Sequence, residues 1–193
     1  MKKLLVLIGC ISLLSIISID AQDFANEGIW EVGGGIGFNS TTGVSDGETD
    51  DESLTQFWFN PYVGYFVVDG VELGLIPTLS ILSQGDASLT SFGILFAPAY
   101  NFDLGNCWYP FIEGRVGYNT STLDPGEGDS HTDSGLEWGF RGGVKAQVGN
   151  AALVNAGLFY SQITMNHEDW DGGRNGENVF GIEVGFTVFV NTR

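Results

Sequence analysis

The chain has 193 residues, of which 24 are acidic and 7 are basic, and its formal net charge is −17. Such an acidic surface repels the phosphates of nucleic acids and offers no electrostatic attraction to anionic headgroups, which argues against nucleic-acid binding. The 29 glycines and the aromatic content of 13%, with few runs that favour helix, indicate one all-β domain. No segment after residue 21 reaches the roughly twenty apolar residues of a transmembrane helix.

Residues 1–21 are typical of a cleaved secretory signal peptide, with two lysines, an apolar run and Ala21 as the last residue before the cut. Two alternatives stay open, an uncleaved membrane anchor and a lipoprotein signal. Residues 7–10, Leu-Ile-Gly-Cys, resemble a lipobox in which Cys10 would be lipidated, but the apolar run continues well beyond Cys10. Removal of the signal leaves Cys107 as the only cysteine, which excludes an intrachain disulfide and argues against a cysteine-ligated metal.

The rest of the chain contains eight segments in which apolar and polar residues alternate. In one of them Leu136, Trp138 and Phe140 alternate with Glu137 and Arg141. A period of two is that of a β-strand with one apolar and one polar face. The eight predicted strands are residues 29–39, 54–66, 71–82, 89–102, 108–119, 133–149, 152–163 and 179–190.

Two prolines fall within these predicted strands. Pro77 and Pro98 each remove a donor from the ladder of hydrogen bonds. We therefore expect bulges or irregular strand ends at both positions.

The connections between the predicted strands alternate in length. Short ones are residues 67–70, 103–107 and 149–151, a medium one is 83–88, and long polar ones are 40–53, 119–134 and 164–178. Short turns at one end and long loops at the other are typical of a transmembrane up-and-down barrel, with the short turns facing the periplasm.

The size of the side chains indicates which face of each strand points into the barrel. On the polar face, the residues between the charged ones are mostly Gly, Ala or Ser, whereas the other face is bulky and apolar. The interior of an eight-stranded barrel is only just wide enough for side chains, so the small face must point inward. The sequence therefore predicts an eight-stranded antiparallel up-and-down transmembrane β-barrel at residues 22–193, with its apolar face in lipid.

Aromatic residues are expected to form a belt at each membrane interface. The predicted belt at the short-turn end contains Trp30, Tyr65, Tyr100, Phe102, Trp108 and Tyr109. The predicted belt at the loop end contains Phe38, Phe57, Tyr118, Trp138 and Tyr160.

Two motifs carry a resemblance to a known family. Residues 60–66, Asn-Pro-Tyr-Val-Gly-Tyr-Phe, are followed after a turn by residues 72–74, Glu-Leu-Gly, and the last predicted strand reads Glu-Val-Gly-Phe-Thr-Val-Phe-Val over residues 183–190. The chain from residue 22 to 193 thus resembles the small eight-stranded outer-membrane barrels of Gram-negative bacteria, the OmpA/OmpX/OmpW-like group, and especially those of Bacteroidetes.

The resemblance implies a location, partners and an assembly signal. The last strand would be read by the barrel-assembly machinery through Glu183, Gly185, Val188 and Val190, although the usual terminal aromatic residue is replaced by residues 190–193, Val-Asn-Thr-Arg. Outer-membrane lipid and lipopolysaccharide are the other expected partners, and a monomer is expected.

Eight charged residues share the inward-facing parity of the predicted strands: Glu31, Glu72, Glu113, Glu137, Glu183, Arg115, Arg141 and Lys145. Buried charges must be paired, and Arg115 and Arg141 on adjacent strands are expected to meet Glu113 and Glu183. One interpretation is a polar plug that fills the lumen. The other is a narrow pore in which the surplus of carboxylates would favour cations.

Acidic residues also crowd the predicted long loops, where Asp46, Glu48, Asp50, Asp169 and Asp171 are weak candidates for a Ca²⁺ or Mg²⁺ site. No loop has the spacing of an EF-hand, so we expect solvated loops without a bound metal or cofactor.

Enzyme chemistry has little support in the sequence. His131 lies between Ser130 and Asp133, and His167 precedes Glu168, but neighbours on a loop rarely hold the geometry of a catalytic triad. The leading hypothesis is a non-enzymatic surface, envelope-integrity or adhesion protein with acidic extracellular loops. A small passive channel is the alternative, and a lipid A-modifying barrel enzyme is third.

Overall fold

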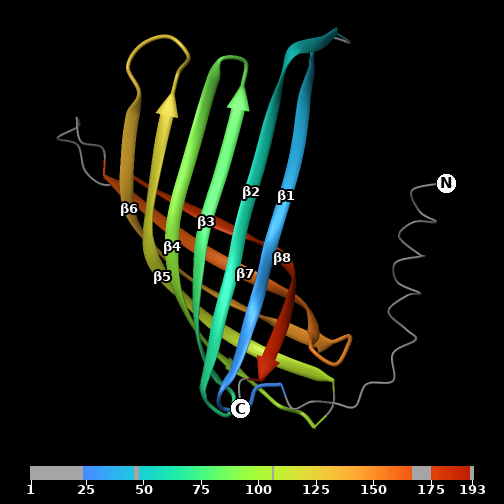
Figure 1. Ribbon diagram of the computed structural model, residues 1–193. Helices are drawn as coiled ribbons and strands as arrows, with labels where there is room; N and C mark the ends of the chain where they lie inside the picture. Colours follow the sequence, from blue (N-terminus) through green and yellow to red (C-terminus); the bar gives the residue numbers. More distant parts are fainter. Residues whose placement is uncertain (1–23, 46–47, 106, 167–174, 192–193) are drawn as a thin grey trace.

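The computed structural model describes residues 24–45, 48–105, 107–166 and 175–191 as one closed antiparallel barrel of eight strands in sequence order (Figure 1). The predicted fold class is therefore confirmed. The strands are β1 Ile29–Ser45, β2 Glu48–Val68, β3 Val71–Gln84, β4 Ala87–Asn101, β5 Trp108–Asp124, β6 His131–Gln147, β7 Ala152–Asn166 and β8 Asn175–Asn191. No helix in the described part of the chain is long and apolar enough to span a bilayer. The predicted signal peptide lies outside the described residues.

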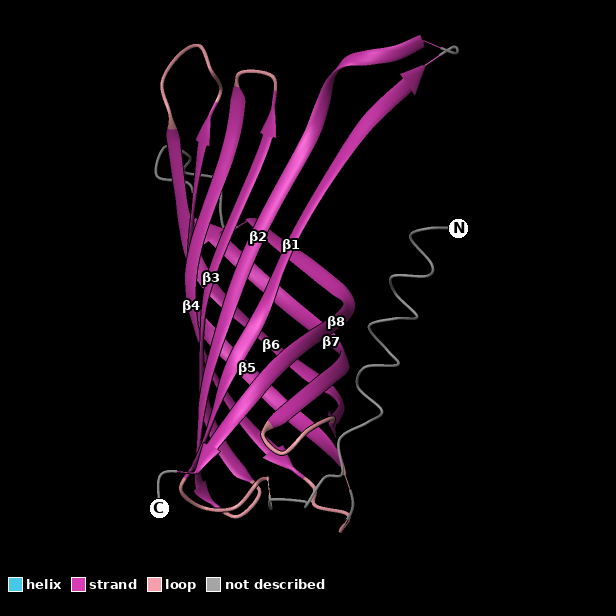
Figure 2. Ribbon diagram, turned by 45° about the vertical axis from the view of Figure 1, so that its right-hand side comes forward, coloured by secondary structure: helices cyan, strands magenta, loops and turns pink. Residues whose placement is uncertain are grey.

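The strands are longer at the loop end than their apolar alternation predicts. Most of the predicted 40–53 loop belongs to β1 and β2, and β5 and β6 continue past the apolar band to Asp124 and His131. There the ladder is lined by polar pairs, such as the 3.0 Å hydrogen bond between the hydroxyls of Thr122 and Thr132. Apolar alternation ends where lipid contact ends, whereas backbone pairing continues above the membrane. Figure 2 shows the resulting tall strands of the β1–β4 wall.

The two faces of the strands point as their side-chain sizes predict. On β6 the outward Leu136, Trp138 and Phe140 are 59%, 47% and 58% exposed, while the alternate Arg141 and Lys145 are 6% and 2% exposed. Exposed aromatic and aliphatic residues around the whole barrel suit a wall that contacts acyl chains.

The aromatic belts are present with one exception. Trp30 contacts Tyr65 at 4.8 Å between ring centroids near the short turns, and Trp138 contacts Tyr160 at 6.0 Å toward the other end. Tyr109 was expected in the short-turn belt, and this prediction is wrong. It follows Trp108 at the start of β5, so alternation turns its ring into the lumen, where it is 3% exposed.

Neither Pro77 nor Pro98 produces the expected bulge. Between β3 and β4 the register runs unbroken through both prolines. The missing pairs lie on the other side of each proline, where the register is kept. β2–β3 pairing skips from Phe59 to Val63, a gap in which Pro61 lies opposite Pro77, and β4–β5 pairing skips from Phe96 to Ala99. The register shifts lie elsewhere, between Thr42 and Val44 and between Phe66 and Val68.

Bulky inward residues on β2 are matched by glycines on β1. In the register, Gly33 lies opposite Tyr62, and Gly37 lies opposite Trp58. A Cβ atom at Gly37 would collide with the indole of Trp58, and one at Gly35 would lie 2.8 Å from the same ring. The glycines of β1 thus make room inside the narrow barrel for the aromatic side chains of β2.

The ladder that closes the barrel is short. β1 pairs with β8 only from Ile29 to Gly34, opposite Asn191 to Phe186, whereas β1 pairs with β2 along almost its whole length. Above Gly34 the two strands diverge (Figure 2). The barrel is therefore closed by backbone pairing at the short-turn end and has an unpaired seam above it.

Two adjacent glycines of β6 provide a test of the inward and outward assignment. A Cβ at Gly143 would overlap the backbone of Ala156 and Gly157, whereas one at Gly142 meets nothing nearer than the Phe111 carbonyl oxygen at 3.7 Å. We expect Gly143→Ala to lower the free energy of unfolding by about 1–3 kcal/mol through overpacking. Gly142→Ala is the control and should change it little. Urea unfolding in lipid vesicles measures both, and equal effects would contradict the assignment.

Candidate functional site: the barrel lumen

An apolar cluster fills the short-turn end of the lumen. Phe24, just before β1, is fully buried, and its ring packs at 5.0–5.3 Å between centroids against Phe66, Tyr109 and Phe189. Leu153 belongs to the same cluster. The lumen was expected to be polar, but at this end it is a hydrophobic core. No alternation pattern indicates Phe24, because it precedes the first strand.

Backbone bonds hold the segment that carries Phe24 in place. The Gly70 amide donates to the Ala25 carbonyl at 2.7 Å, and the Gly28 amide donates to the Phe66 carbonyl at 2.9 Å. The Glu27 amide donates to the Asp69 carboxylate at 2.9 Å. The segment is therefore tied to the β2–β3 turn and lies across the mouth of the barrel.

Lys145 lies directly above this apolar cluster, between two buried carboxylates. Its ammonium group donates to Glu31 at 2.6 Å and to Glu72 at 2.9 Å, and all three side chains are at most 3% exposed. Thr187 donates to the other Glu31 oxygen at 2.7 Å, and Asn101 donates to Glu72 at 3.0 Å. These neutral donors spread the negative charge of two carboxylates that share one lysine.

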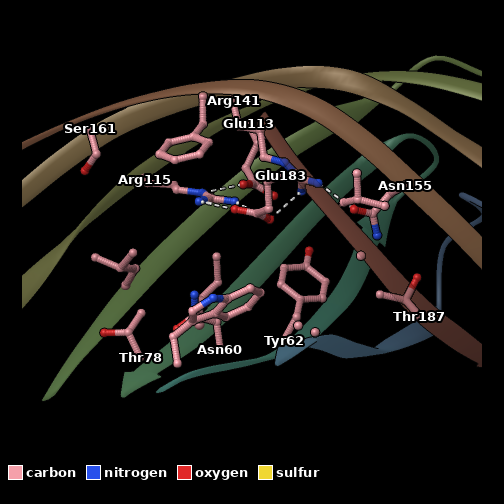
Figure 3. A pocket seen from close by; sticks show the side chains of 18 of the residues that line it. Asn60, Tyr62, Thr78, Glu113, Arg115, Arg141, Asn155, Ser161, Glu183 and Thr187 are labelled. Atoms are coloured by element: carbon pink, nitrogen blue, oxygen red, sulfur yellow. Dashed lines mark hydrogen bonds and ion pairs between the residues drawn. The ribbon is translucent and has the colours of Figure 1, made fainter. Parts of the chain in front are cut away.

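A second charged cluster lies higher, around two guanidinium groups. Arg115 donates to Glu113 at 2.7 Å and forms a fork with both oxygens of Glu183, at 3.0 and 3.2 Å. Arg141 reaches Glu183 at 3.4 Å and also donates to Asn155. Figure 3 shows Glu183 between the two arginines. The arginines thus meet the two glutamates that the parity of the sequence predicts.

Glu137 differs from the other inward carboxylates. It accepts hydrogen bonds from Ser161 at 2.7 Å and from Asn119 at 3.3 Å. Within the described residues, no lysine or arginine forms an ion pair with it. Glu137 is therefore held by neutral donors alone, beside the arginine cluster.

A cavity of about 170 Å³ lies between the two charged clusters and the upper lumen. Its lining combines charged side chains, such as Arg115 and Glu183, with the rings of Trp58, Tyr62 and Phe159. Figure 3 shows the arginine cluster on one side of this cavity and Tyr62 on another. The aromatic lining was not predicted from the sequence, in which Trp58 and Tyr62 break the alternation of β2.

The remaining predicted site residues are dispersed. In β8, Val188 and Val190 face outward, at 40% and 52% exposure, and recognition by the assembly machinery stays a prediction. The weak metal candidates Asp46, Asp169 and Asp171 lie outside the described residues, while Glu48 and Asp50 fall in β2 rather than in a loop. Within the described residues there is no cluster of three metal-ligating side chains.

The two histidines do not form a described site. His131 is exposed and lies in β6, in ladder register with Leu123, and His167 lies outside the described residues.

The sequence matches the outer membrane protein beta-barrel domain family over residues 10–187. The chain belongs to this family. Among proteins of curated function there is no significant match. The family and the fold point to the outer membrane as the location. Bacteroidetes origin stays a prediction.

Solved structures with a similar fold are small outer-membrane barrels. Neisserial surface protein A has a TM-score of 0.57 and 20% identity, over 86% of this chain and 97% of the other. The N-terminal barrel of Pseudomonas aeruginosa OprF has a TM-score of 0.52 and 14% identity, over 85% and 98%. OprG of Pseudomonas aeruginosa has a TM-score of 0.49 and 14% identity, over 88% and 100%. At these identities the likeness concerns the fold alone.

The Lys145 cluster leads to a stability prediction. Lys145→Met leaves Glu31 and Glu72 buried without their shared cation, so we expect a loss of about 3–5 kcal/mol in the free energy of unfolding. In the control, Glu31→Gln and Glu72→Gln are added to Lys145→Met. The triple variant should recover much of the loss, because no uncompensated charge remains. A triple variant as unstable as the single one would contradict the role of the ion pairs.

Proposed function

We propose that this barrel is a non-conducting, non-enzymatic outer-membrane protein with a surface or envelope-integrity role. The observation that carries the proposal is the layered filling of the lumen. Phe24 and its aromatic neighbours fill the short-turn end, and the paired Lys145 cluster lies directly above them. Water and ions moving along the axis would have to displace both layers, at the cost of an apolar core and a buried ion-pair network.

In the proposed orientation the short turns face the periplasm and the acidic upper strands and loops face the exterior. This orientation gives the surface of the cell a negatively charged structure, which suits adhesion or packing among lipopolysaccharide molecules bridged by divalent ions. Secretion with a signal peptide cleaved after Ala21 is part of the proposal, and cleavage there would make Phe24 the third residue of the mature chain. Insertion by the barrel-assembly machinery and a monomeric state also belong to it.

A small passive channel is the second candidate. The cavity of about 170 Å³ and the five lumenal carboxylates against three basic groups favour it, because they give part of the path a cation-attracting lining. Conduction then requires displacement of the Phe24 segment. The two candidates therefore differ in whether the short-turn end is closed.

Planar-bilayer recording separates these functions. The refolded wild-type protein should give no steady conductance steps. Phe24→Ala combined with Lys145→Ala removes the central side chain of each layer, and we expect it to give small steps that favour cations. Phe140→Ala removes a lipid-facing ring that is 58% exposed and should stay silent. Steady steps from the wild-type protein would overturn the plug and establish the channel.

A further inference from the structure

The unpaired part of the β1–β8 seam lies within the apolar band of the barrel. Immediately above the last pair, Ile36 of β1 is 66% exposed, and Val184 and Ile182 of β8 are 62% and 74% exposed. These outward side chains mark the depth that contacts acyl chains. The backbone edges of β1 and β8 above Gly34 and Phe186 therefore border the hydrocarbon without pairing to each other.

The inner margins of this seam are formed by glycines and covered by aromatic rings. Gly35 of β1 lies under the indole of Trp58, and a Cβ at Gly181 of β8 would lie 2.8 Å from the ring of Phe159. These glycines contribute no side chain to the seam, and Glu183, between Gly181 and Gly185, reaches the arginine cluster. Gly35, Gly185 and Val184 line the same cavity as the arginine cluster, so this cavity reaches the seam.

The charges that line the cavity are unbalanced. The lining carries four carboxylates, those of Glu31, Glu113, Glu137 and Glu183, against three basic groups, those of Lys145, Arg115 and Arg141. Lys145 is paired with Glu31. Glu113 and Glu183 already engage the arginines, which leaves Glu137 with neutral donors only. The side chain of Glu183 is 33% exposed, so it also offers an accessible oxygen. A surplus carboxylate attracts a cation, and aromatic rings strengthen that attraction.

We propose that the cavity binds the head of a small amphipathic organic amine that enters from the bilayer through the seam between β1 and β8. The ammonium group lies near Glu137 and Glu183, and the apolar part extends between the strand edges toward lipid. A volume of about 170 Å³ suits a single small ring or a short chain, since cavities of about 150 Å³ accept benzene. An anionic head is disfavoured because the lining carries more carboxylates than basic groups. This binding does not depend on whether the lumen conducts.

Calorimetric titration of the barrel in lipid nanodiscs tests the charge preference. The probes are 4-phenylbutylamine and two near-isosteres, 4-phenylbutyrate and 4-phenylbutanol, with empty nanodiscs to subtract partitioning into lipid. We expect saturable binding of the amine at one site, about tenfold or more tighter than the acid or the alcohol. Binding of the acid as tight as that of the amine, or no saturable signal beyond partitioning, would overturn the proposal.

Two substitutions locate the bound amine. Glu137→Gln should weaken amine binding about tenfold or more, whereas Glu127→Gln, on an exposed loop residue, should not. Trp58→Leu should also weaken binding, through the loss of the aromatic wall. Heat-dependent migration in detergent gels verifies that each variant is folded. Unchanged affinity in a folded Glu137→Gln or Trp58→Leu variant would refute the site.

The entry route is tested by blocking the seam. In a Cys10→Ser/Cys107→Ser background, a bulky maleimide on Val184→Cys should slow the association of the amine, because Val184 borders the seam and lines the cavity. The same label on Ile112→Cys, 60% exposed on the lipid-facing wall of β5, should have no effect. Equal association rates in the two labelled proteins would overturn the route through the seam, while the charge preference rests on the first experiment.

Discussion

The need to pair backbone donors and acceptors in hydrocarbon governs this structure. Lipid offers no hydrogen-bonding partner, so the strands must close into a ring, and their side chains then alternate between lipid and lumen. With eight strands the lumen is narrow, which limits what the inward parity can carry. Gly37 opposite Trp58 is a direct result: where one strand places an indole inside, its neighbour contributes no side chain at all. Side-chain size is therefore constrained as strictly as polarity.

The same narrowness explains why charges occur inside and why they are paired. The lumen excludes bulk water over much of its length, so each ionised group needs a partner within the ring. Lys145 forms ion pairs with two carboxylates, and Glu183 forms ion pairs with two arginines. These pairs join strands that are far apart in the sequence. Below them, the aromatic cluster around Phe24 closes the end without any charge. Stability and closure of the lumen thus come from the same contacts.

The sequence predicts the features that depend on local alternation. It does not reveal the features that depend on side-chain contacts across the barrel lumen. The strand starts at the short-turn end and the inward direction of Arg115 and Arg141 follow from a period of two, whereas the strand ends at the loop end do not. Phe24 has no period to reveal it, since its partners come from β2, β5 and β8. Pro98 was expected to distort the sheet, but a ladder can lose pairs on one side and keep its register. Which pairs are lost depends on which neighbouring strand the proline nitrogen, which has no hydrogen to donate, faces.

The seam between β1 and β8 is subject to both constraints, the pairing of backbone groups in hydrocarbon and the narrowness of the lumen. Its two strands come from opposite ends of the barrel sequence, so no short turn fixes their register. Their pairing ends at Gly34 and Phe186, beside the cavity that Gly35 and Gly185 line. Backbone groups left unpaired at this depth are costly in lipid. An amphipathic amine in the seam replaces lipid along those edges and brings a positive charge to Glu137, so the break in the ladder supplies the entry and the surplus carboxylate supplies the affinity.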